Sequence, residues 1–135
     1  PVYQSDRLKR YRERAEERVP SSDELAQVLE HFVKGEVLGG AIFDGAGRPL
    51  AALLPTTTDA TRLGAAIFAL HANVGTVARL AGLEPRSYTF VLDHRDGILA
   101  ATTVAGRCLV AVLVTKTHGD DGAREKLTAL TKKLH

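Results

Sequence analysis

Apolar residues recur along this chain at two spacings, one typical of helices and the other of strands. The clearest helical stretch follows Ser21, which stands three residues before Glu24 in a capping-box arrangement. Its apolar residues fall at i, i+3, i+4 and i+7, and so share one helix face: Leu25, Val28, Leu29 and Phe32. We predict a helix that begins after Ser21, packs one face on a core and ends near Gly35.

A longer helix is predicted from Asp59, a favourable N-cap residue, to about Gly82. One stripe of apolar residues is expected to face the core: Leu63, Ile67, Leu70, Val74, Val77 and Ala81. The opposite side carries small or apolar residues where a monomer normally carries Glu and Lys: Ala65, Phe68, Ala72, Gly75 and Thr76. Because a helix that is apolar or small all round is expected to be buried on two sides, we predict that a second helix packs against it.

Five segments have the length and composition of strands. The first two, VLGGAIFD and RPLAALLP, flank a turn at 44–47 and predict a hairpin; Pro49 favours an edge strand because proline lacks an amide hydrogen. The other three are RSYTFVLDH, GILAATTV and RCLVAVLVT, and the last is apolar throughout, as a central strand would be. A final helix, capped by Asp120 or Asp121, completes the order αββαβββα, with an extra helix before it.

We divide the chain into a basic N-terminal extension with the extra helix, residues 1–20, and one domain, residues 21–135. Residues 1–19 carry six Lys and Arg against four Asp and Glu, and the acidic residues interleave with the arginines. This pattern favours a solvated helix over a nucleic-acid contact. The longest apolar run, 109–114, is far shorter than the roughly 20 residues that span a bilayer, and residues 1–14 lack the apolar core of a secretory signal. We expect a cytoplasmic protein that binds no nucleic acid and does not insert into a membrane.

Residues that could support catalysis are few and scattered. Cys108 is the only cysteine and stands in an apolar strand, the opposite of the setting that activates a thiol. The five histidines match no catalytic motif, and the groups around His94 and His118 lie on turns, where His and Asp commonly make local hydrogen bonds. The glycine-rich segments match no nucleotide-binding pattern. We expect no enzyme activity, no metal and no cofactor.

Three stretches, taken together with the order of elements, resemble the roadblock/dynein light chain family: GGAIFDGAGRPLAALLP, DATRLGAAIFALHANVGTVARLAG and CLVAVLVTKTHGDDGAREKLTALTKKL. The resemblance covers residues 23–134. It implies an α/β (α+β) fold with a five-stranded antiparallel sheet in the order 2-1-5-4-3. The long middle helix would lie on one face of the sheet and the terminal helices on the other.

The resemblance also implies a homodimer that joins through the long helix and the third strand. Together with the outward side of the long helix described above, it predicts these interface residues: Ala65, Phe68, Ala72, Gly75, Thr76, Tyr88, Phe90 and Val91. Members of the family scaffold small Ras-like GTPases or, in bacterial gliding motility, activate them, so we expect a protein-binding scaffold or regulator of such a GTPase. The exposed polar residues of the long helix, Arg62, Asn73 and Arg79, are the expected contacts with this partner.

Two alternatives remain open. The same kind of sheet can hold a small molecule, in which case Ile42, Leu53 and Leu113 would line a cavity instead of filling a core. The domain could also be an adaptor without a GTPase partner, including one that contacts nucleic acid or a membrane surface through residues 7–14. Binding dominated by phosphate contacts would weaken steeply with salt.

Overall fold

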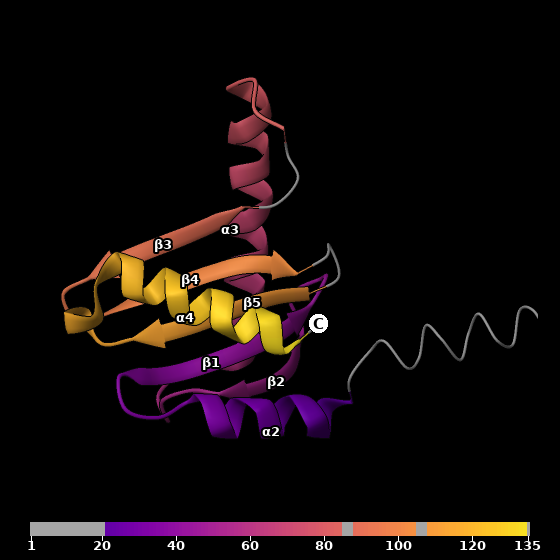
Figure 1. Cartoon of the computed structure of the whole chain (residues 1–135). Coiled ribbons are helices and arrows are strands. Elements are labelled where there is room, and N and C mark those ends of the chain that lie inside the picture. Colours follow the sequence, from indigo (N-terminus) through magenta and orange to yellow (C-terminus); the bar gives the residue numbers. More distant parts are fainter. Residues whose placement is uncertain (1–20, 85–87, 105–107, 135) are drawn as a thin grey trace, which may run out of the picture.

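The structure is a computed structural model in which residues 21–84, 88–104 and 108–134 are described. Five strands form one sheet with helices on both of its faces (Figure 1). The elements, in chain order, are α2 (Ser22–Phe32), β1 (Val37–Asp44), β2 (Pro49–Leu53), α3 (Ala60–Leu80), β3 (Thr89–His94), β4 (Gly97–Val104), β5 (Cys108–Val114), η1 (Lys116–His118) and α4 (Gly119–Lys133). The extra helix predicted within residues 1–20 lies outside the described residues.

The strand order is β2-β1-β5-β4-β3, and every neighbouring pair is antiparallel. This confirms the predicted fold, with the apolar β5 at the centre and the Pro49 strand at an edge. The β1–β2 turn is held by Asp44, whose Oδ1 accepts hydrogen bonds from the backbone amides of Ala46 and Arg48, both at 2.9 Å. The other edge of the sheet is β3.

The larger core lies between the sheet and the helices α2 and α4, and includes Leu29, Ile42, Val112, Leu127 and Leu130. The helix α2 begins as predicted, because Ser21 Oγ accepts a hydrogen bond from the Glu24 amide at 3.2 Å. It ends at Phe32, before Gly35.

The cap predicted for the last helix was wrong. Residue His118 occupies the N-cap position of α4 without a side-chain hydrogen bond to the helix. Because η1 carries the chain into the helix two or three residues earlier than predicted, Asp120 and Asp121 lie inside its first turn. There their charge still favours the positive end of the helix dipole.

On the opposite face a smaller core joins α3 to the sheet through Ile67, Phe43 and Leu109. The helix begins as predicted, with Asp59 Oδ1 accepting from the amides of Thr61 and Arg62 at 3.0 and 3.2 Å. Its 21 residues make a helix about 31 Å long, whereas five strands spaced about 4.8 Å apart make a sheet about 19 Å wide. As a result, α3 crosses the sheet and extends beyond the edge strand β3 (Figure 1).

Because α3 extends past the sheet, the predicted core-facing stripe of this helix is buried only in part. Residue Ile67 is buried, but Leu70 and Val77 are 45% and 64% exposed, and Ala81 is also exposed. The periodicity located an apolar face correctly. It could not reveal that the sheet is too narrow to cover that face to its end.

Candidate partner-binding surface

The position of α3 is fixed near its start by a contact between two glycines. The backbone of Gly64 lies against that of Gly47 in the β1–β2 turn, and a side chain at Gly64 would also collide with the Phe43 ring. The φ of Gly47, +84°, lies in the left-handed region that favours glycine. The hairpin turn therefore supports α3 on one flank, next to Phe68.

Beyond the sheet, α3 and the residues that follow it expose several large apolar side chains. The exposed fractions are 64% for Val77, 84% for Leu80 and 63% for Leu83. Phe68 and Leu70, earlier in α3, are also exposed. We call Val77, Leu80 and Leu83 the overhang; within the described residues, no element of the same chain covers it.

An apolar groove of about 300 Å³ lies on the α3 face of the sheet. We call it the leucine groove, after the five leucines that line it: Leu54, Leu63, Leu92, Leu99 and Leu113. Thr58, His94, Asp96 and Gly97 complete its wall. Leu92, on β3, is 59% exposed, so the groove opens beside the free edge of the sheet.

The structure places the predicted interface residues in two groups. Four on α3 are exposed and available to a partner: Ala65, Phe68, Ala72 and Thr76. The others already have contacts inside the chain: Gly75 packs against Tyr88, Phe90 against the core under α3, and Val91 against the core on the other face. These last four lie at or near the edge strand, where only part of each residue is exposed.

All three predicted partner contacts are exposed, but they do not form one cluster. The guanidinium of Arg62 lies 3.6 Å from Asp59, in the first turn of α3. The guanidinium of Arg79, in the last turn, lies 3.5 Å from Thr76 Oγ1. The two arginines are 17 positions apart along the helix, or about 25 Å, so a partner that meets both must lie along most of α3. Asn73 lies between them.

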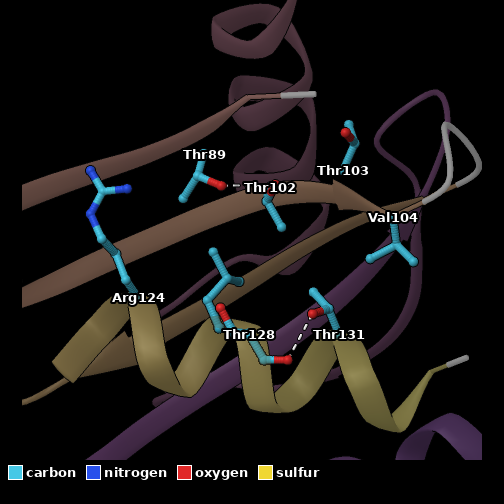
Figure 2. Close-up of a pocket in the computed structure, with 8 residues that line it drawn as sticks. Thr89, Thr102, Thr103, Val104, Arg124, Thr128 and Thr131 are labelled. Carbon is cyan, nitrogen blue, oxygen red and sulfur yellow. Dashed lines mark hydrogen bonds between the residues drawn. The ribbon is translucent and has the colours of Figure 1, made fainter. Parts of the chain in front are cut away.

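The opposite face of the sheet carries a polar groove of about 420 Å³ between α4 and the strands β3 and β4 (Figure 2). Its lining includes five threonines and Arg124. Thr89 Oγ1 donates to Thr102 Oγ1 at 3.1 Å, and Thr102 Oγ1 donates to the Tyr88 carbonyl at 2.9 Å. The Thr89 and Thr102 hydroxyls are thus engaged with each other and with the backbone, tying the start of β3 to β4.

The groups that the sequence suggested for metal or thiol chemistry make other contacts. Lys116 pairs with Asp93, His118 pairs with Glu36, and the Asp96 amide donates to His94 Nδ1 at 3.1 Å. Burial raises the pKa of the Cys108 thiol, which keeps it protonated and unreactive. Within the described ranges, no group of three or more His, Cys, Asp or Glu side chains could hold a metal ion.

The residues suggested for a small-molecule cavity do not share one. Ile42 is buried in the core beneath α2 and α4, whereas Leu113 lines the leucine groove on the other face. Leu53 is 40% exposed. The three residues therefore do not line one cavity, because alternate residues along a strand point to opposite faces of the sheet.

Neither a family model nor a curated protein sequence matches this chain. Solved structures do match its fold. MglB from Myxococcus xanthus superimposes with a TM-score of 0.73 at 16% identity, over 84% of this chain and 86% of that one. The gliding protein MglB from Thermus thermophilus superimposes with a TM-score of 0.70 at 17% identity, over 85% of this chain and 89% of that one. A Roadblock/LC7 domain from Streptomyces avermitilis superimposes with a TM-score of 0.68 at 13% identity, over 81% of this chain and 92% of that one. The chain therefore has the roadblock/LC7 fold.

The leucine groove was missed by the sequence interpretation. Its leucines come from α3, from three strands and from the segment after β2, and each fits a strand or helix pattern as a core residue. The one available signal was the alternation in β3, which placed Leu92 with Tyr88 and Phe90 on a single face.

Proposed function

We propose that the chain acts as a non-catalytic homodimer in the cytoplasm that regulates or scaffolds a small Ras-like GTPase. The observation that carries the proposal is the pairing of an apolar overhang with an apolar groove across the free strand β3. Neighbouring exposed apolar side chains beside an apolar groove are typical of an interaction site in soluble proteins.

A second copy fits this surface by symmetry. Two β3 strands can pair edge to edge in antiparallel fashion about a two-fold axis perpendicular to the sheet. In such a dimer, the overhang of each copy extends past the paired β3 strands and lies over the α3 face of the other copy's sheet. Val77 and Leu80 would then approach Leu92 of the partner and its leucine groove. One interface would cover the overhang, the groove and the open edge strand.

The length and hydropathy of α3 would also allow it to cross a bilayer: its best 18-residue window has a mean hydropathy of 1.3, and 17% of the window is buried. The contacts of Gly64 and Ile67 with the hairpin and the sheet argue against that use. We therefore assign the exposed apolar residues to a protein interface.

A GTPase partner is supported by the fold shared with MglB proteins and by the family resemblance of the sequence. The exposed side of α3 offers a rigid polar surface through Arg62, Asn73 and Arg79. In the dimer this surface occurs twice about the two-fold axis. A GTPase lying across the axis gives one per dimer, and a GTPase lying to the side gives two.

Titration calorimetry against the GTPases of the source organism, loaded with GDP or with a GTP analogue, tests this proposal. We expect binding that is tighter in one nucleotide state, no GTP hydrolysis by the purified dimer alone, and weaker binding by Arg79→Ala. The substitution Arg48→Ala, in the hairpin, serves as the matched arginine control. Absence of binding in both states below about 100 μM, or ~5.5 kcal/mol, would leave an adaptor with another partner.

A further inference from the structure

The outer half of α3 packs on Tyr88, the residue just before β3. Where the helix passes the edge of the sheet, the His71 ring packs on Tyr88, with ring centroids 5.3 Å apart and planes inclined by 58°. One turn later, Gly75 also lies against Tyr88, where an added Cβ would make an ordinary contact 3.4 Å from Tyr88 Cε2. The carbonyl of Tyr88 is held in turn by Thr102 of β4. The contact thus connects α3 to the sheet through Tyr88.

Two polar atoms are buried in this contact. His71 Nδ1 and Tyr88 Oη are both enclosed, and neither has a hydrogen-bond partner among the described residues. A neutral histidine with its proton on Nε2 leaves only a lone pair at Nδ1. A protonated histidine places an N–H donor there with no acceptor, and an unpaired buried donor is costly. In agreement, desolvation lowers the pKa of His71 below its ordinary value of about 6.5.

The charged residues of α3, β3 and β4 do not offset that cost. On α3 itself, Arg62 and Arg79 lie more than two helical turns away. On β3, Asp93 and His94 stand at the end of the strand far from Tyr88, and β4 carries no charged residue. The connection from α3 to β3 contains Glu84 and Arg86, of which Arg86 lies outside the described residues.

We propose that His71 is a pH-sensitive clasp: its neutral ring holds the outer half of α3 on Tyr88, and its protonation releases the overhang and weakens the dimer. This inference rests on the proposed homodimer. Since the folded protein binds the proton less readily than the unfolded chain, the packing is stable above about pH 6.5. It is lost as the pH falls through the lower, folded-state value.

The test uses the full chain as wild type, as His71→Gln and as His31→Gln. His31, exposed on α2, is the matched control. Urea unfolding between pH 5 and 8 measures the clasp, and sedimentation at the same pH values measures the dimer. Between pH 7.5 and 5.5 we expect the dimer dissociation constant to rise about tenfold in wild type and His31→Gln, and less than about twofold in His71→Gln.

The two measurements separate the clasp from the dimer. A pH dependence of unfolding that is the same in His71→Gln and wild type overturns the clasp. A protein that remains monomeric at pH 7.5 overturns the proposed dimer, while the His71-dependent slope of unfolding still decides whether the clasp exists. A proton NMR titration of His71 in the wild-type protein requires no variant, and a ring that titrates at its ordinary value of about 6.5 also overturns the inference.

Discussion

The backbone of Gly64 in α3 lies directly against the backbone of Gly47 in the β1–β2 turn, with the Phe43 ring beside both. These residues are far apart in sequence, and their contact fixes where the long helix crosses the sheet. It therefore also fixes how far α3 extends beyond β3.

We predict that Gly64→Ala destabilises the domain by about 1 to 3 kcal/mol, because the added methyl group has no space between the turn and the helix. The matched control is Gly75→Ala in the same helix, where the new Cβ makes an ordinary contact with Tyr88. In the control, the better helix propensity of alanine should offset any cost. Urea unfolding measures both variants, and equal effects would contradict the close packing at Gly64.

The dimer proposal predicts that Leu92→Glu weakens self-association about tenfold or more, which corresponds to about 1.4 kcal/mol. Leu92 is exposed in the single chain, so the fold should tolerate the change, but a dimer through β3 would bury the new charge. Phe68→Glu should act in the same direction if the exposed flank of α3 takes part. Leu53→Glu, an exposed leucine on the opposite edge strand, is the control. Sedimentation that is unchanged in Leu92→Glu would exclude an interface through β3.

A third prediction concerns the core beneath α2. Phe32 is 8% exposed and its ring lies 5.6 Å from Lys133 Nζ, so Phe32→Ala removes both apolar packing and a cation–π contact. We expect a loss of about 3 to 5 kcal/mol in the free energy of unfolding. Leu53→Ala, at an exposed leucine, should cost much less. Similar losses in the two variants would show that Phe32 is not a principal core residue.

The fourth prediction concerns the acid stability of the hairpin. Hydrogen bonding by the Arg48 amide is the largest cause that holds the pKa of Asp44 below its ordinary value of 3.8; the Ala46 amide and the Arg48 charge add to it. The stabilising contribution is therefore complete above about pH 3.8 and lost as the pH falls through the lowered value. Asp44→Asn keeps an acceptor oxygen but cannot titrate.

Urea midpoints between pH 2 and 5 should therefore fall less steeply for Asp44→Asn than for wild type. Arg48→Gln keeps the backbone amide and removes only the ion pair, so most of the wild-type dependence should remain. If Asp44→Asn and wild type show the same slope, the turn does not depend on the ionised carboxylate.

The five strands, the α-helices among the described residues and their order could be predicted from local sequence patterns. Ser21 and Asp59 identified two helix starts, Pro49 identified an edge strand, and the uninterrupted apolar run of β5 identified the centre of the sheet. These features are local: a cap needs a side-chain oxygen within three residues, and a strand buried on both faces shows it in its own composition.

Which apolar residues are left uncovered depends on how the elements pack, and no local pattern reveals it. Ile67, Leu70 and Val77 belong to the same apolar repeat of α3, yet of these three only Ile67 is buried. Whether a position on α3 meets the sheet depends on the width of the sheet and on the crossing point set by Gly47 and Gly64. The leucine groove likewise exists only where side chains from separate strands meet beside α3. Periodicity reports the face on which a residue lies, whereas burial also requires that another element reach that far.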